Sequence, residues 1–167
     1  MFMPQCEPVA PKLTRRSGGS QFAIHESSRL HRSICDCGWV RRLEPDEGLI
    51  HQGTEPSFVG VVLSGVLRLQ KLHKDGTYRV LGFLFPGALF GSPGRGVRDC
   101  GVEAATAAHV ACLDHRTFMA LMEADRGLER TFFAAALDEL DAAYELSSLL
   151  GIQRRDARVA AYLHCLI

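Results

Sequence analysis

Between Trp39 and Leu113, short apolar runs alternate with turn-forming residues at nearly regular intervals. The turns include Asp46-Glu47-Gly48, Ser64-Gly65 and Pro86-Gly87. Short apolar runs bounded by such residues are typical of β-strands, and many of them in series indicate a sandwich or a barrel. The corners of a small roll require positive φ angles, which glycine adopts most readily. The middle of the chain is therefore predicted to form a small antiparallel β-roll.

One pair of strands is predicted to be a hairpin. The turn sequence Lys74-Asp75-Gly76-Thr77 separates the runs 66–70 and 80–85, which can pair in antiparallel fashion. The run from Val102 to Leu113 supplies the last strands of the roll.

Helical patterns flank this region. The mixed apolar pattern from Phe22 to Ile34 favours a helix before the roll. Asp114 is placed to cap a helix whose first turn contains His115, Arg116 and Thr117. A longer helix is predicted from Gly127 to Leu150, because this stretch is rich in Ala, Leu, Glu and Asp and has no internal Gly or Pro.

The long helix carries two apolar stripes. The first stripe has a 4-3-4 spacing and consists of Phe133, Leu137, Leu140 and Tyr144. The second consists of Phe132, Ala136, Ala143, Leu146 and Leu150. A helix with two apolar stripes must bury two sides. One side can lie on the roll, and the simplest partner for the other is the same helix of a second copy. The alternative is a helix buried within a monomer.

The predicted domain organisation has four parts. Residues 1–20 form a flexible leader, 21–122 the β-roll domain, 123–152 a dimerisation helix, and 153–167 a hinge with the start of a further, truncated domain. No apolar run approaches the roughly 18 residues that a membrane-spanning helix needs. The first residues do not resemble a signal peptide, so a cytoplasmic protein without membrane contact is expected.

Several spaced blocks resemble the cyclic-nucleotide-binding β-roll of the Crp/Fnr superfamily of bacterial transcription regulators. They are Gly48-Leu-Ile-His-Gln-Gly, Phe58-Val-Gly-Val-Val-Leu-Ser-Gly-Val-Leu-Arg-Leu, Asp75-Gly and Val80-Leu-Gly-Phe-Leu-Phe-Pro-Gly-Ala-Leu-Phe-Gly. The blocks Asp138-Glu-Leu-Asp-Ala-Ala, Leu149-Leu-Gly and Ala157-Arg-Val-Ala-Ala-Tyr-Leu look like the dimer helix and hinge of the Fnr branch. The resemblance runs from about Trp39 to Ile167.

The resemblance implies a sensory module that responds to a redox, gas or small-molecule signal. In the family a winged helix-turn-helix follows the hinge, and only what resembles its first helix is present here. DNA contact is therefore expected only through a C-terminal domain absent from this chain. The formal net charge of zero, with 19 basic and 19 acidic residues, agrees with this expectation. The alternative is a DNA-binding-deficient interaction module that dimerises with a complete homologue.

An enzyme is not expected. The sequence contains no nucleophile elbow, P-loop or dinucleotide-binding fingerprint. The Gly-rich segment that starts at Gly91 lacks the Lys-Ser/Thr ending of a P-loop, and we interpret it as a loop at the mouth of a pocket.

The resemblance also implies a ligand pocket. Its candidate residues are Gly87, Gly91, Ser92, Arg98 and Asp99. Arg98 matches the family's phosphate-binding arginine, whereas Ser92 stands in place of the ribose-binding glutamate and Asp99 in place of the phosphate-binding serine. A carboxylate beside a phosphate is repulsive, so a cyclic nucleotide is not the expected ligand. Arg98 is instead expected to lie at the surface or to pair with Asp99.

The Fnr branch senses oxygen through an iron–sulfur cluster held by four thiolates. Of the six cysteines, only Cys6 lies in the leader, and Cys35 and Cys37 come late. By the resemblance, Ala111 occupies the position of the remote ligand and Cys112 follows it, on the opposite face of a strand. Cys112 remains a redox or metal candidate together with Cys35 and Cys37. The cofactor is left open, with an iron–sulfur cluster as one alternative and a thiol switch at Cys35 and Cys37 as another.

Overall fold

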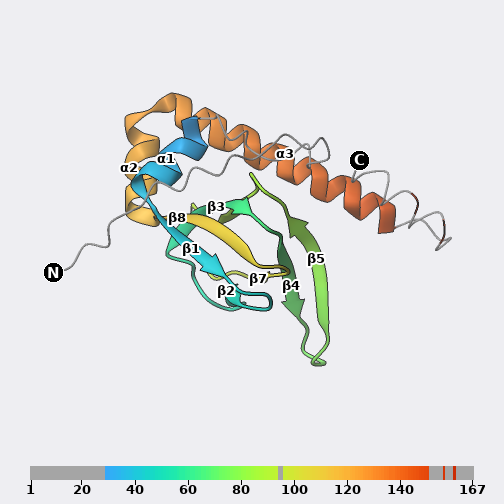
Figure 1. Cartoon of the computed structure of the whole chain (residues 1–167). Helices are drawn as coiled ribbons and strands as arrows, with labels where there is room; N and C mark the ends of the chain where they lie inside the picture. Colours follow the sequence, from blue (N-terminus) through green and yellow to red (C-terminus); the bar gives the residue numbers. More distant parts are fainter. Residues whose placement is uncertain (1–28, 94–95, 151–155, 157–159, 161–167) are drawn as a thin grey trace.

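The computed structural model describes residues 29–93, 96–150, 156 and 160. The predicted leader and most of the hinge, together with Cys6, lie outside the described residues. Figure 1 shows a β-roll with helices gathered along one side of it. The strands are β1 (Trp39–Leu43), β2 (Gly48–Ile50), β3 (Phe58–Ser64), β4 (Leu67–Leu72), β5 (Tyr78–Leu84), β6 (Leu89–Gly91), β7 (Gly101–Ala104) and β8 (Ala108–Asp114), and the helices are α1 (Arg29–Cys37), α2 (His115–Ala124) and α3 (Arg126–Leu150).

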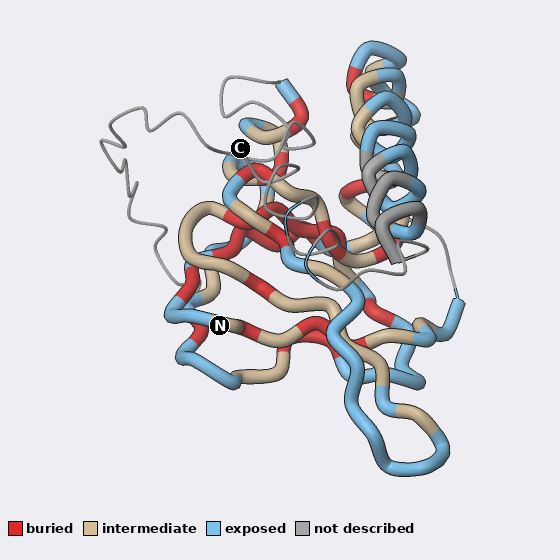
Figure 2. The backbone as a smooth tube through the Cα atoms, turned by 90° about the vertical axis from the view of Figure 1, so that its right-hand side faces the viewer, coloured by how far each residue is buried: buried red, intermediate tan, exposed pale blue. Residues whose placement is uncertain are grey.

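The strands form two four-stranded antiparallel sheets, in the orders β1-β8-β3-β6 and β2-β7-β4-β5. Inward-facing residues of both sheets enclose one apolar core, which includes Leu43, Val62 and Leu67. Figure 2 shows the buried residues concentrated in the strands of the roll. The predicted antiparallel roll with flanking helices and a long C-terminal helix is confirmed.

β8 separates this inner core from a second, outer core. Val110 and Cys112 point into the roll, whereas Ala111 and Leu113 point outward, because successive side chains of a strand alternate between its faces. The outer core is covered by α1, whose Leu30 and Ile34 are fully buried, and by α2 and the start of α3. Each fully buried aliphatic side chain of this kind contributes roughly 2 kcal/mol to stability.

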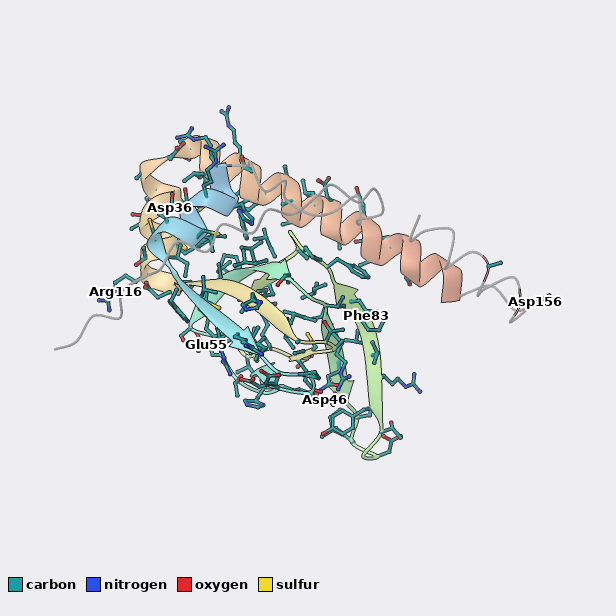
Figure 3. The ribbon with its side chains drawn as sticks, viewed as in Figure 1. Asp36, Asp46, Glu55, Phe83, Arg116 and Asp156 are labelled. Atoms are coloured by element: carbon teal, nitrogen blue, oxygen red, sulfur yellow. The ribbon has the colours of Figure 1, made fainter. Side chains whose placement is uncertain are left out.

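The β4–β5 connection is the predicted hairpin. Gly76 has a φ of 82°, and the backbone N–H of Thr77 donates to Asp75 Oδ1 at 3.0 Å. β5 is an edge strand, and Phe83 on its outer side is exposed, as is Asp46 in the turn between β1 and β2 (Figure 3).

Acidic residues cap the two C-terminal helices. The Asp114 carboxylate accepts a hydrogen bond from the backbone N–H of Thr117 at 3.0 Å, which confirms the predicted cap of α2. Asp125 accepts from the N–H of Gly127 at 2.8 Å and so caps α3. Its other oxygen accepts from Arg29 at 2.6 Å, which joins α1 to the junction of α2 and α3.

Of the α3 side chains that the structure describes, those that pack on the rest of the molecule lie in the first turns of the helix. Phe132 makes an edge-to-face contact with Phe118, with 5.2 Å between the ring centroids, and Ala135 packs on the outer core. The expectation that one side of this helix lies on the roll is met at Phe132, whereas Ala136 and Ala143 of the same stripe are exposed. The side chains of Leu146 and Leu150 lie outside the described residues. None of the helices in the described ranges has an apolar stretch long enough to cross a membrane.

Candidate functional site

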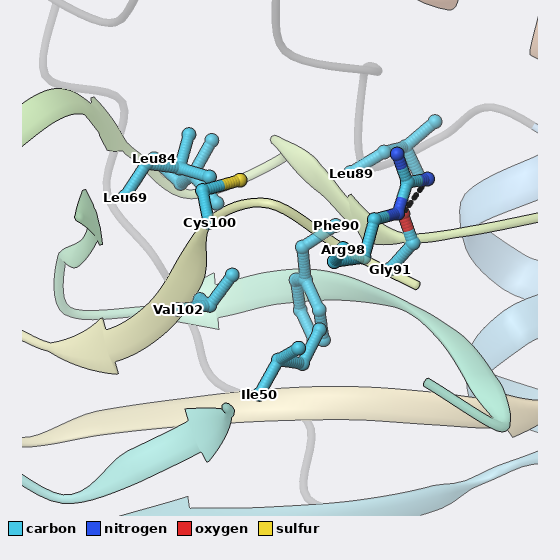
Figure 4. A pocket seen from close by; sticks show the side chains of 9 residues that line it. All are labelled: Ile50, Leu69, Leu84, Leu89, Phe90, Gly91, Arg98, Cys100 and Val102. Atoms are coloured by element: carbon cyan, nitrogen blue, oxygen red, sulfur yellow. Dashed lines mark hydrogen bonds between the residues drawn. The ribbon is translucent and has the colours of Figure 1, made fainter. Parts of the chain in front are cut away.

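A cavity of about 290 Å³ opens between the two sheets of the roll. Its walls are mainly apolar side chains from both sheets, and among the lining residues that the structure describes one, Arg98, is charged (Figure 4). The lining residues are Ile50, Leu69, Leu84, Leu89, Phe90, Gly91, Arg98, Cys100 and Val102. The volume is close to the roughly 300 Å³ at which small-molecule sites begin.

Arg98 is held at the cavity by its backbone and by its side chain. Its N–H donates to the carbonyl of Thr54 at 2.9 Å, and its own carbonyl accepts from the N–H of Gly53 at 2.8 Å. Its Nη2 donates to the carbonyl oxygen of Gly91 at 3.0 Å. The turn at residues 53–54 therefore fixes the loop that brings a guanidinium group to a largely apolar cavity.

The backbone conformation and the close packing at position 91 require glycine. The φ of Gly91, 91°, lies in the left-handed region, and a Cβ atom built there would collide with the backbone carbonyl oxygen of Phe58. A side chain at this position would strain the backbone and push β6 away from β3. The Gly91 carbonyl that accepts from Arg98 is thus in a position that only glycine provides.

The other three predicted pocket residues do not line the cavity. Gly87 is buried, and its N–H donates to the Val62 carbonyl at 2.8 Å. Ser92 is buried beside the site, with 7% of its surface exposed. The side chain of Asp99 is 93% exposed and lies 3.7 Å from Lys71 Nζ. The expected pairing of Arg98 with Asp99 is wrong, because the two side chains bind different partners.

The described lining of the cavity suits the anionic phosphate of a cyclic nucleotide better than its ribose. Arg98 can bind an anionic group. The residue at the ribose position, Ser92, is not in the lining, and no acidic side chain is found among the described lining residues. The Asp99 carboxylate is turned away, so it does not repel an anion in the cavity.

The cysteines lie on opposite sides of β8. Cys112 is buried in the inner core, where desolvation raises its thiol pKa to about 12. Cys35, on α1, packs against the outer core together with Ala111. The structure therefore separates Cys112 from the α1 cysteines, as the alternation of β8 predicts. In the described ranges, no three or more His, Cys, Asp or Glu side chains are grouped closely enough to hold a metal ion.

The predicted thiol switch lacks a low-pKa thiol at Cys35. Burial, and next the nearby Asp36 carboxylate, raise the pKa of Cys35, whose Sγ lies 3.8 Å from His31 Nδ1. Cys37 is exposed. Arg41 and Arg42 pair with Glu47 and Glu44, at 2.6 and 3.1 Å.

The first apolar stripe of α3 faces solvent. Phe133, Leu137, Leu140 and Tyr144 are 58%, 61%, 44% and 63% exposed. Large apolar side chains gathered on one side of a helix in this way mark an interaction surface. The stripe begins one residue after Phe132, which packs on the outer core.

Sequence reasoning misses most of the cavity wall. A small buried hydrophobe is the ordinary expectation for Cys100, yet it lines the cavity, as do Leu84 and Val102. The inward-facing alternation along the strands marks such residues, but it does not distinguish a filled core from a cavity.

The comparisons with known proteins agree with this architecture. A family model described as the cyclic nucleotide-binding domain matches residues 40–125. A probable transcriptional activator of Rhizobium leguminosarum bv. viciae is 31% identical over 124 residues, which are 74% of this chain and 52% of that protein. The transcriptional activator protein FnrL of Cereibacter sphaeroides is 29% identical over 145 residues, 80% of this chain and 58% of that protein.

Among solved structures, FixK2 from Bradyrhizobium japonicum superposes with a TM-score of 0.69 at 26% identity, over 75% of this chain and 64% of that one. The chain spans about half the length of the two activators it matches. This chain belongs to the cyclic nucleotide-binding domain family, in the form found in Crp/Fnr-type transcription regulators.

Proposed function

We propose that this chain is the sensory and dimerising part of a Crp/Fnr-type transcription regulator that acts in the cytoplasm and responds to a small molecule. Its relatives are named as transcriptional activators, which supports the regulatory role. Binding to DNA is assigned to a DNA-binding domain that the described residues do not include.

The observation that carries the proposal is the combination of a cavity in the roll and an unpartnered apolar stripe on α3. Leu89 lines the cavity and also packs against the outer core. The same core contains Leu128 and contacts Phe132, at the start of α3. A ligand that moves β6 can therefore act on the base of the helix through the outer core that both contact. It shifts the helix only if it binds the two arrangements with unequal affinity.

Phe133, Leu137, Leu140 and Tyr144 form the surface that pairs with a second copy. They occupy one side of a 25-residue helix, so a two-fold pairing of α3 helices covers them all. Each copy then presents its roll on the outside of the helix pair.

Sedimentation equilibrium tests the proposal. Leu140→Asp places a carboxylate at the centre of the stripe and is expected to convert a dimer into a monomer. Ala134→Asp is the matched control, because Ala134 is exposed and lies about 100° around the helix from Phe133. A wild-type monomer, or a Leu140→Asp variant that stays dimeric, would contradict the proposal. Co-purification with a full-length homologue in place of self-association would favour the interaction-module alternative.

A further inference from the structure

Within the described residues, the lining of the cavity in the roll combines one cation with apolar walls. Arg98 is its charged lining residue, and Leu84, Phe90 and Val102 are among its apolar ones. A site of this kind suits a ligand with a single anionic end, because burying further polar groups without partners costs free energy.

The guanidinium group of Arg98 has N–H donors beyond the one that binds the Gly91 carbonyl. It carries five N–H groups in a planar fork, and Nη2 donates to the Gly91 carbonyl. Within the part of the chain that the structure describes, no acidic side chain lies within salt-bridge distance of Arg98, and Asp99 is directed to Lys71 instead. A planar fork matches the two oxygens of a carboxylate.

The rest of the lining disfavours a ligand with many hydroxyl groups. The ribose of a nucleotide would face aliphatic side chains, the Phe90 ring and the Cys100 thiol. A hydroxyl group that leaves water without gaining a hydrogen bond costs free energy. An apolar ligand body gains free energy from the same walls.

From these contacts we infer that the cavity binds a small carboxylate with an apolar body. The carboxylate lies on Arg98, and the body lies against Leu84, Phe90 and Val102. This inference rests on the proposed sensory function and names the class of its ligand. Cyclic nucleotides are weak ligands of the site.

Calorimetric titration of the full chain with matched probes tests the inference. The probes are 4-phenylbutyrate, phenylacetate and octanoate, each compared with its neutral amide, together with cyclic AMP. The best carboxylate is expected to bind at least about tenfold more tightly than its amide, because a charge-assisted bidentate contact is lost in the amide. Cyclic AMP is expected to bind at least about tenfold more weakly than the best carboxylate.

Two arginine variants test whether Arg98 is the residue that binds the carboxylate. Arg98→Gln is expected to remove the preference for the carboxylate, whereas Arg79→Gln, at an exposed position on β5, is expected to keep it. The wild-type comparison of each carboxylate with its amide stands even where Arg98→Gln fails to fold. Equal binding of acid and amide, no binding by all three carboxylates at millimolar concentration, or tighter binding of cyclic AMP would overturn the inference.

Alkylation of the Cys100 thiol tests whether the bound probe occupies the cavity. The sulfur of Cys100 points toward the cavity, so the bound carboxylate is expected to slow its modification, as followed by peptide mass spectrometry (Figure 4). Cys37 on α1 is exposed and outside the cavity, so its rate is expected to stay the same. Failure of the carboxylate preference with an intact α3 dimer overturns the ligand class alone, whereas a monomeric wild-type chain overturns the sensory and dimerising function.

Discussion

Leu89 touches both the cavity in the roll and the outer core against which Phe132 of α3 packs. β6, which carries Leu89, is held to β3 through the pairs Val59–Gly91 and Val61–Leu89. Val59 and Val61 themselves belong to the outer core. A shift of β6 is therefore expected to reach the base of α3 through the packed side chains of the outer core.

The first prediction concerns this contact. Binding of 4-phenylbutyrate is expected to slow amide hydrogen exchange in residues 128–135 of the wild-type chain. Leu89→Ala is expected to keep measurable binding and to reduce this protection, since the shortened side chain no longer fills the space between cavity and core. Mass-spectrometric hydrogen exchange measures both. Undiminished protection in Leu89→Ala would show that the signal takes another route.

The second prediction compares two glycines with positive φ. Gly53 has a φ of 80°, and a Cβ atom added there would meet no other atom within 4 Å, whereas one added to Gly91 would meet the Phe58 carbonyl. Gly53→Ala is expected to cost about 1–2 kcal/mol for the left-handed backbone alone. Gly91→Ala is expected to cost more and to weaken binding at the cavity. Urea denaturation of both variants checks the order, and equal losses would contradict it.

The third prediction is the pH dependence of the α2 cap. Hydrogen bonds from the side chain and then the backbone of Thr117 lower the pKa of Asp114. The cap therefore stabilises the fold above the ordinary carboxyl pKa, and this contribution is lost as the pH falls through the lower folded pKa. Asp114→Ala is expected to cost about 1 kcal/mol at neutral pH.

Asp114→Asn is the control for that prediction, because asparagine also caps helices but does not titrate. It is expected to keep most of the stability at neutral pH and to flatten the acid dependence. Thermal unfolding between pH 2 and pH 7 measures the difference. An unchanged acid slope in Asp114→Asn would assign the titration to another carboxyl group.

The fourth prediction concerns Cys112. Its buried thiol has a pKa raised to about 12, and its side chain lies on the inner face of β8, away from Cys35. Iodoacetamide at pH 8 is expected to modify Cys37 well before Cys112. Iron and sulfide analysis after anaerobic purification is expected to give the same content for the wild type and for Cys112→Ala. Loss of bound iron in that variant would make Cys112 a ligand.

Local rules predicted much of the fold. The hairpin at Asp75-Gly76 and the cap at Asp114 depend on residues close in sequence, and both are present. The opposite orientations of Ala111 and Cys112 follow from the two-residue period of a strand. These features need no knowledge of distant contacts.

The site was harder to predict, because contacts between residues far apart in the sequence determine its geometry. Arg98 turns to Gly91 and away from Asp99 because residues 53–54, far along the chain, fix its backbone on both sides. The exposure of Ala136 likewise depends on where α3 leaves the outer core. Apolar spacing alone does not specify that point.

Site-directed cross-linking is the most direct test of the central claim that α3 pairs with its copy along the apolar stripe. Leu140→Cys, in a background with Cys6, Cys37 and Cys165 replaced by serine, is expected to form a disulfide-linked dimer on mild oxidation, because a parallel two-fold pairing of the helices places each position of the stripe opposite its copy. Ala134→Cys in the same background is expected to remain uncross-linked. Equal cross-linking at both positions, or none at position 140, would contradict the account.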